Sequence, residues 1–204
     1  GYVTASISYR LSGVEKYPAA IEDVRCAVRW LRAHANQYNA DPDKIALIGG
    51  SAGGHLSLLA GYADDDAFVA DCDVDVSSKV QAIIDLYGPV DLTTEYARTH
   101  KLTTSFFGVS YKEAPDRYKE CSPLAWLTPD DPPTLIFQGT IDDLVPVSQS
   151  DTLKAALDRN GVTNEYHRLK GWPHTLDLSQ KMNDYCQYYM DQFLKRVFEE
   201  SAAE

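Results

Sequence analysis

Serine chemistry is the first possibility raised by this sequence, at the pentapeptide Gly49-Gly50-Ser51-Ala52-Gly53. The pentapeptide lies between an apolar run at 44–48, typical of a buried strand, and a helical segment at 54–62. A sharp strand-to-helix turn holds a serine in a strained backbone conformation, and only glycines leave room for its neighbours. Such a turn lifts the hydroxyl above the sheet and points the N–H of Ala52 at an oxyanion formed on the serine. The pattern predicts a nucleophile at Ser51; the structural alternative is a glycine-rich turn that packs a helix close to a sheet.

A serine hydroxyl is barely nucleophilic at neutral pH, so it needs a base among the five histidines. The candidates are His34, His55, His100, His167 and His174. His55 follows Ser51 by one helical turn and is expected to point along the helix rather than across the site. His174, in the segment Gly171-Trp172-Pro173-His174, follows a late strand and lies in a loop. We therefore predict His174 as the base.

An acid that orients the base is expected after the apolar run 134–138, where the turn Gly139-Thr140-Ile141 leads to Asp142 and Asp143. Two adjacent acids usually lie in a solvated loop. Here, however, they follow the carboxyl end of a strand, where open α/β sheets hold their functional groups. The resulting chain order of nucleophile, acid and base is the order found in α/β-hydrolase triads.

Strand-like and helix-like apolar periods alternate along the chain. Strands are expected at 2–9, 44–48, 80–87, 134–138 and 165–169, and helices at 18–37, 54–62, 146–160 and 178–198. This alternation predicts an α/β fold, a mostly parallel sheet with helices on both faces. No repeat, low-complexity tract or linker divides the chain, so residues 1–204 are expected to form one domain. The aromatic segment 93–128 is expected to be a small cap, whose rings either line a pocket or pack the cap onto the sheet.

Charge and composition exclude several classes of partner. The 19 Lys and Arg against 30 Asp and Glu give a net charge of −11, which would repel nucleic acid and an anionic membrane surface. The longest stretch without a charged residue, 45–63, contains five glycines, so we expect no membrane span. The cysteines Cys26, Cys72, Cys121 and Cys186 show neither a metal-ligand spacing nor a disulfide scaffold. No signal peptide is recognised and the chain starts at Gly1, so the compartment stays open, with the cytoplasm slightly favoured.

Further motifs extend along the chain. They are Tyr9-Arg10-Leu11, Pro18-Ala19-Ala20 with Glu22-Asp23-Val24, Asp41-Pro42-Asp43-Lys44-Ile45, Gly50-Ser51-Ala52-Gly53-Gly54-His55-Leu56, Tyr87-Gly88-Pro89-Val90-Asp91-Leu92, Ser122-Pro123-Leu124 and Gln138-Gly139-Thr140-Ile141-Asp142-Asp143-Leu144-Val145-Pro146. With them, nearly the whole chain resembles the α/β-hydrolase esterase/lipase family related to hormone-sensitive lipase, and more closely its small bacterial carboxylesterase and acetyl- or feruloyl-esterase-like branch. The resemblance implies that Ser51 is the nucleophile and His174 the base. It also implies that Asp142, not Asp143, orients the base.

The chain departs from the family pattern in two places. Gln138 stands where the family usually has His, beside the acid loop, and we expect little effect on the triad. The family also carries a His-Gly-Gly motif, whose N–H groups complete the oxyanion hole, and a central strand between those that match 2–9 and 44–48. Neither is present in these 204 residues. We expect a fragment of a longer enzyme, rather than a chain whose remaining strands have re-paired.

The resemblance implies a serine carboxylesterase that hydrolyses small, short-chain acyl esters through a Ser-His-Asp triad and an acyl-enzyme intermediate. It implies neither a metal nor an organic cofactor. The Ala52 N–H is the expected oxyanion donor, and the candidate substrate-binding residues are Gly50, Tyr87 and Trp172. The open alternatives are an arylformamidase-like or oligopeptidase-type amide hydrolase, and a catalytically silent fragment or binding module. Homo-oligomer formation is also left open, and Arg10 is expected to pair with Asp23 in a structural role.

Overall fold

The computed structural model describes residues 1–69, 72 and 74–200, and its centre is a four-stranded parallel sheet. The strands are β1 (Ala46–Gly50), β2 (Ala82–Leu86), β3 (Thr134–Gly139) and β4 (Asn164–Leu169). They lie in chain order, and each strand runs parallel to its neighbour. Parallel neighbours need a crossover connection, which the helices supply. The predicted α/β fold class is confirmed.

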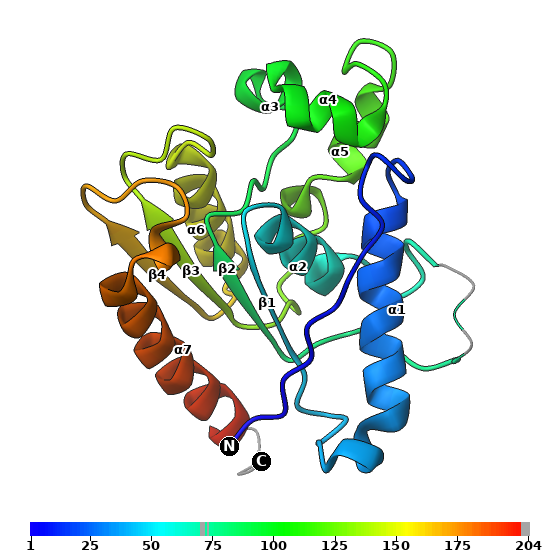
Figure 1. Cartoon of the computed structure of the whole chain (residues 1–204), viewed down its shortest axis with the longest axis vertical. Coiled ribbons are helices and arrows are strands. Elements are labelled where there is room, and N and C mark those ends of the chain that lie inside the picture. Colours follow the sequence, from blue (N-terminus) through cyan, green and yellow to red (C-terminus); the bar gives the residue numbers. More distant parts are fainter. Residues whose placement is uncertain (70–71, 73, 201–204) are drawn as a thin grey trace.

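Helices cover both faces of this sheet (Figure 1). They are α1 (Ala19–His34), α2 (Ala52–Tyr62) and α6 (Ser148–Asn160) on one face and α7 (Gln180–Glu200) on the other. In β2, Ile83 packs in the cluster with α1, α2 and α6, whereas Ile84 packs in the cluster with α7. Because a strand alternates its side chains between faces, a strand buried on both faces is mostly apolar, and in β2 Asp85 is the exception.

Three short helices lie above the carboxyl end of the sheet (Figure 1). They are α3 (Glu95–Thr99), α4 (Lys101–Phe107) and α5 (Pro115–Glu120); the 3-10 helices are η1 (Ala35–Tyr38), η2 (Pro123–Ala125) and η3 (Leu176–Leu178). Helices α3, α4, α5 and η2 fall within the segment 93–128 that is expected to form a cap. The rings of Phe107 and Tyr118 stack at 4.0 Å and are buried, so some of the aromatic residues of this segment pack the helices together.

Helix ends follow local sequence signals. Helix α6 ends at Asn160, and Gly161 adopts φ 71°, the left-handed conformation that the Asn160-Gly161 pair predicts for a C-terminal stop. Helix α1 ends at His34, earlier than expected, because the chain tightens there into η1.

The strand expected at 2–9 does not form. This segment has no strand pairing, and the side chains of Tyr2 and Val3 are 50% and 49% exposed. A strand needs a neighbouring strand to form its backbone hydrogen bonds. Among the described residues, no strand lies between this segment and β1. Strand β1 is therefore an edge strand, not the buried strand expected, and Ile48 in it is 57% exposed. The described strands have not re-paired around the gap.

Helix α1 anchors two neighbouring segments. The expected pairing of Arg10 with Asp23 is present, with the guanidinium 2.8 Å from the carboxylate. A disulfide between Cys26 and Cys72, which the sequence analysis did not predict, joins α1 to the connection between α2 and β2. The cysteines are 46 residues apart, and only the fold brings them together.

We predict that replacing both cysteines with serine (C26S/C72S) lowers the free energy of unfolding by about 2–4 kcal/mol, because the cross-link restricts the unfolded chain. Urea unfolding followed by circular dichroism measures the difference. The unchanged protein with a thiol reductant should show the same shift of midpoint. Alkylation of all four cysteines without prior reduction would contradict the disulfide.

Asp85 is a fully buried carboxyl group in β2, beneath the turn at Ser51. Its Oδ1 accepts the N–H of Gly88 at 2.9 Å, whereas its Oδ2 is buried without a hydrogen-bond partner. Burial raises the pKa of Asp85 to about 8, and the single bond from Gly88 only partly opposes this. The carboxyl group is therefore protonated in the folded protein at neutral pH.

This protonation makes stability depend on pH. Between its ordinary pKa near 3.8 and about 8, Asp85 holds a proton only in the folded state, so its own contribution to stability is complete below 3.8 and is lost as pH rises through this window. We predict that Asp85→Asn loses less stability than the unchanged protein between pH 5 and pH 8, by up to about 1.4 kcal/mol per pH unit. Urea unfolding at both pH values measures this. The exposed Asp143→Asn is the matched control, and equal pH slopes for all three proteins would contradict the prediction.

Candidate active site

Ser51 lies in a sharp turn between β1 and α2, with φ 54° and ψ −117°. This is a strained conformation for a serine, and it is held by the Ser51 N–H, which donates to the carbonyl oxygen of Leu86 at 2.8 Å. A side chain on Gly49 would overlap the backbone of Gly53, so the close approach of β1 and α2 requires glycine. The turn predicted from the pentapeptide is present, and it presents the Ser51 hydroxyl at the carboxyl end of the sheet.

His174 and Asp142 complete a hydrogen-bonded chain with this serine. His174 Nε2 lies 3.0 Å from Ser51 Oγ, and His174 Nδ1 lies 2.7 Å from Asp142 Oδ2. A carboxylate only accepts, so Nδ1 carries the proton and Nε2 is free to accept from the hydroxyl. The side chain of His174 is 8% exposed and that of Asp142 is 0% exposed. The fold thus brings together three residues that are as many as 123 positions apart.

Asp142 is surrounded by donors. Its Oδ1 accepts the backbone N–H groups of Leu144 at 2.9 Å and Val145 at 2.8 Å. Burial alone would raise the pKa of Asp142, but the bonds from His174, Val145 and Leu144 outweigh it and hold the pKa below its ordinary value. The group is therefore ionised at neutral pH. Asp143 is exposed and outside this cluster.

Gln138 also contacts the acid, with its Nε2 3.1 Å from Asp142 Oδ2. From its place in the sequence beside the acid loop, Gln138 is expected to have little effect on the triad. The tertiary structure makes it a direct hydrogen-bond partner of Asp142, at the end of β3 and 0% exposed.

Tyr87 holds the loop that carries the base. It follows β2 with φ 49°, and its ring meets the imidazole of His174 edge-on at 4.6 Å between centroids. Its hydroxyl donates to Asp177, a residue that sequence reasoning missed because no motif marks it. Burial, with the neighbouring Asp177 carboxylate, raises the pKa of Tyr87 well above its ordinary value, so the hydroxyl keeps its proton.

The other candidate site residues lie around this cluster. Gly50 is exposed beside Ser51, and a side chain there would come within 2.9 Å of the Tyr87 hydroxyl. Trp172 is partly buried against the α7 cluster, and its carbonyl oxygen accepts the Ile141 N–H at 3.1 Å. Ala52 is the first residue of α2, so its N–H has no acceptor within the helix and points out at the turn.

The remaining histidines have other contacts. His55 is buried with Nδ1 2.9 Å from the carbonyl of Pro89 and Nε2 3.4 Å from the thiol of Cys121, so it faces away from Ser51. Burial lowers the pKa of His55 to about 4, against the opposing effect of the Pro89 bond. His34 stacks on Trp30, His100 caps α4 and His167 stacks on Phe137.

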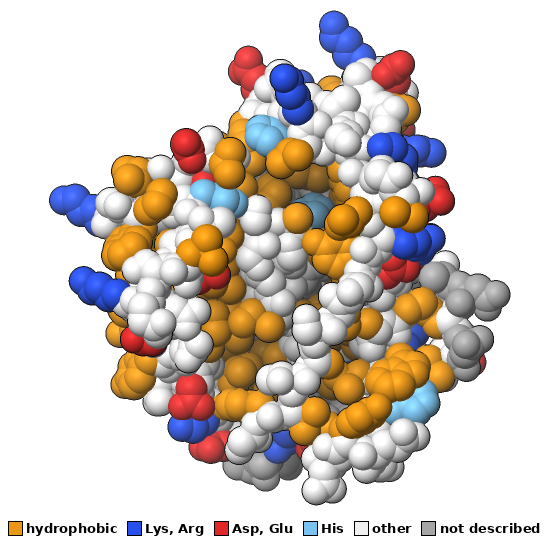
Figure 2. Space-filling model, viewed as in Figure 1, with side chains coloured by type: hydrophobic (Ala, Val, Ile, Leu, Met, Phe, Trp, Pro, Cys, Tyr) orange, Lys and Arg blue, Asp and Glu red, His pale blue; other side chains and the backbone are white. Residues whose placement is uncertain are grey.

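Figure 2 shows hydrophobic side chains gathered around a hollow between the short helices α3 to α5 and the carboxyl end of the sheet. Burial, with the charge of Asp142, raises the pKa of Tyr96 of α3 to about 12. Ile141, Leu144 and Leu178, from the acid and base loops, are exposed by 60%, 45% and 81%. The serine thus lies below an open, largely apolar surface.

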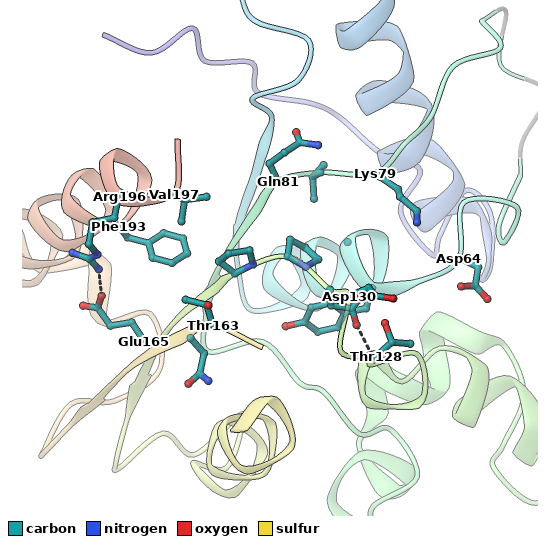
Figure 3. A pocket seen from close by; sticks show the side chains of 17 residues that line it. Asp64, Lys79, Gln81, Thr128, Asp130, Thr163, Glu165, Phe193, Arg196 and Val197 are labelled. Carbon is teal, nitrogen blue, oxygen red and sulfur yellow. Dashed lines mark hydrogen bonds and ion pairs between the residues drawn. The ribbon is translucent and has the colours of Figure 1, made fainter. Parts of the chain in front are cut away.

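A separate groove of about 830 Å³ lies at the amino ends of the strands. Figure 3 shows Phe193, Arg196 and Val197 of α7 on one side of it and Lys79, Asp64 and Asp130 on the other. Arg196 is paired with Glu165 in this groove. None of the residues that line it belongs to the Ser51 cluster.

Within the described ranges, no group of three or more His, Cys, Asp or Glu side chains is arranged to hold a metal ion. In that same part of the chain, every helix is too short or too polar to cross a membrane.

The chain is similar to known esterases over most of its length. The BD-FAE family model matches residues 1–157. Esterase LipQ of Mycobacterium tuberculosis is 33% identical over 185 residues, covering 88% of this chain and 44% of LipQ. The probable carboxylic ester hydrolase LipM of the same organism is 34% identical over 155 residues, covering 74% of this chain and 36% of LipM. The chain thus spans less than half the length of these curated relatives.

Solved structures of similar proteins have the same fold. A truncated carbohydrate esterase from gut microbiota superposes with a TM-score of 0.76 and 30% identity, covering 92% of this chain and 73% of that one. The esterase Est2 of Thermogutta terrifontis superposes with a TM-score of 0.77 and 26% identity, covering 93% of this chain and 69% of that one. Structures of Est2 with bound propionate and with bound butyrate match equally well.

The Tyr87–Asp177 bond predicts a measurable effect on Ser51. We expect Tyr87→Phe to slow the reaction of Ser51 with a fluorophosphonate probe about tenfold, because the loop that carries His174 loses a hydrogen bond to a charged group. Labelling rates followed by intact mass give the comparison. Tyr166→Phe is the matched control, since its hydroxyl donates to Asp151 at 2.8 Å far from the site. Equal labelling rates in the two variants would show that the Tyr87–Asp177 hydrogen bond does not position His174.

Proposed function

We propose, from the premise that this chain belongs to the BD-FAE family of α/β-hydrolase esterases, that it hydrolyses short-chain carboxylic esters with Ser51 as the nucleophile. His174 acts as the base and Asp142 orients it. The observation that carries the proposal is the continuous hydrogen-bonded chain from Ser51 Oγ through His174 to Asp142, with distances of 3.0 and 2.7 Å. A solvated glycine-rich turn would have no reason to hold a buried imidazole and a buried carboxylate in line with its serine.

The geometry supports a two-step acyl transfer. Ser51 Oγ attacks the ester carbonyl carbon while His174 Nε2 takes the hydroxyl proton, and the oxyanion accepts a hydrogen bond from the Ala52 N–H. Asp142 stays ionised and stabilises the imidazolium. When the C–O bond of the ester breaks, His174 returns the proton to the departing alkoxide. A water molecule activated by His174 then hydrolyses the acyl-enzyme and frees the carboxylic acid.

The surroundings of Ser51 favour a small ester. Est2, which has the same fold, is solved with propionate and with butyrate bound, and the cap segment of this chain is built from short helices only. Gly50 lies exposed beside the serine, where a substrate would approach. Tyr87 acts on the substrate mainly through the loop it holds, because its hydroxyl already donates to Asp177. Trp172 is the candidate to contact the substrate with its partly buried ring.

Oxyanion stabilisation sets the level of activity. Each donor to an oxyanion contributes about 10²–10³-fold in turnover. Among the described residues, Ala52 supplies the donor at the turn, and a second donor would approach over the open edge of β1. With Ala52 as the donor at the turn, a catalytically weak chain is the alternative to an active esterase, and the assay must distinguish the two.

An amide hydrolase of the arylformamidase or oligopeptidase type would use the same three residues. The names of the relatives favour the ester reaction, since LipQ is an esterase and LipM a probable carboxylic ester hydrolase. Assaying an anilide beside each matched ester distinguishes the two, because an esterase cleaves the ester much faster.

We expect the purified protein to hydrolyse p-nitrophenyl acetate and butyrate faster than the octanoate. Ser51→Ala should reduce kcat/KM by at least about 10³-fold, as expected when a nucleophile is removed. Ser77→Ala, at an exposed serine distant from the site, should retain full activity. Equal rates for the unchanged protein and Ser51→Ala would show that Ser51 is not a working nucleophile, and failure of a fluorophosphonate to label Ser51 would agree with that result.

A further inference from the structure

Gln138 occupies a buried position between the acid loop and α6. It is the fifth residue of β3, its side chain is 0% exposed, and its Nε2 lies 3.1 Å from Oδ2 of Asp142. His174 donates to the same oxygen at 2.7 Å. One carboxylate oxygen therefore accepts from both the base and the glutamine.

The orientation of the Gln138 amide is determined by its neighbours. The Oε1 atom accepts from the hydroxyl of Ser150 at 3.0 Å, and Ser150 is also 0% exposed. The Nε2 atom faces three acceptors, which are Asp142 Oδ2 and the carbonyl oxygens of Gly139 and Val145, both at 3.2 Å. A flipped amide would place an oxygen against all three, so the donor side must face Asp142.

These contacts complete the set of donors around the acid. The Oδ1 atom accepts two backbone N–H groups and the Oδ2 atom accepts from His174 and Gln138, which uses the four lone-pair positions of the carboxylate. Without Gln138, Oδ2 would have one donor, and the carboxylate could rotate about its bond to Cβ and take the imidazole with it. An amide donates at every pH without changing its charge, unlike the imidazole that the family usually has at this position.

We propose that Gln138, held by Ser150, is a positioning residue of the triad that keeps Asp142 Oδ2 aligned with His174 and, through it, His174 Nε2 aligned with Ser51. This inference rests on the proposed function, because it concerns the alignment of the same three residues. Gln138 acts through Asp142 and does not touch the substrate, so its loss should change turnover and leave substrate binding unaltered.

The test compares Gln138→Leu, which removes the donor, with Gln138→His, which restores an N–H donor, and with Ser150→Ala, which frees the amide. Thr134→Val is the matched control: Thr134 lies at the other end of the same strand, is 0% exposed, and its hydroxyl bonds only to Tyr62 and the Pro132 carbonyl. Steady-state kinetics on p-nitrophenyl butyrate, circular dichroism melting curves and ¹H NMR of the His174 Nδ1–H proton are recorded for each. Ser51→Ala is included in the kinetic series.

We expect Gln138→Leu to lower kcat about 10- to 100-fold with KM unchanged, the size of a lost hydrogen bond to a charged group. Ser150→Ala should give a smaller loss, and Gln138→His should recover most of the kcat at pH 8. The deshielded Nδ1–H signal should shift or broaden in Gln138→Leu and stay unchanged in Thr134→Val. The proposal would be overturned if the kcat of Gln138→Leu equalled that of Thr134→Val. It would also be overturned if Thr134→Val, at an equal loss of melting temperature, lost as much kcat as Gln138→Leu.

The NMR signal separates this inference from the proposed function. If the unchanged protein is no faster than Ser51→Ala, the proposed esterase function fails, but a changed Nδ1–H signal in Gln138→Leu still supports the positioning role. If the esterase is active and the signal and kcat are both unaffected in Gln138→Leu, only the positioning role fails. Should Gln138→Leu not fold, Ser150→Ala carries the same comparison with Gln138 in place.

Discussion

The turn at Ser51 is the constraint on which the site depends. A serine at φ 54° occupies the left-handed region that side chains avoid, and it stays there because β1 is paired with β2, α2 starts immediately, and Gly49 lies against Gly53. The strain is useful, because the same backbone path that is unfavourable for the serine exposes its hydroxyl and frees the Ala52 N–H. The loops that carry His174 and Asp142 then need only to place these side chains beside the Ser51 hydroxyl.

Parallel pairing is what allows the other parts to reach it. In a parallel sheet the carboxyl ends of all strands lie at one edge, so the loops that follow β1, β3 and β4 deliver Ser51, Asp142 and His174 to the same place. Tyr87, at the end of β2, then bonds the base loop back to the sheet through Asp177.

Two buried carboxyl groups near the serine show how local donors decide charge. Asp142 has four donors and stays ionised, whereas Asp85 has one donor and is protonated at neutral pH, with a pKa of about 8. The cost of burying a charge is met in the first case by hydrogen bonds and avoided in the second by taking up a proton. Only an ionised acid can stabilise an imidazolium, and so the two groups cannot exchange roles.

Local sequence patterns determined the α/β class, the positions of most helices and strands, the sharp turn at Ser51 and the chain order of the candidate residues Ser51, Asp142 and His174. Apolar periodicity, glycine spacing and turn residues act over a few positions, so they are visible in the chain itself. The segment 2–9 shows the limit of this reasoning: its alternation is that of a strand, but a strand forms only beside a partner. The placement of Gln138 against Asp142, the bond from Tyr87 to Asp177 and the Cys26–Cys72 disulfide were decided by the tertiary structure alone. Side chains as many as 90 residues apart meet there, and no local pattern encodes which of the available donors, acceptors and thiols the packed sheet and helices will bring within bonding distance.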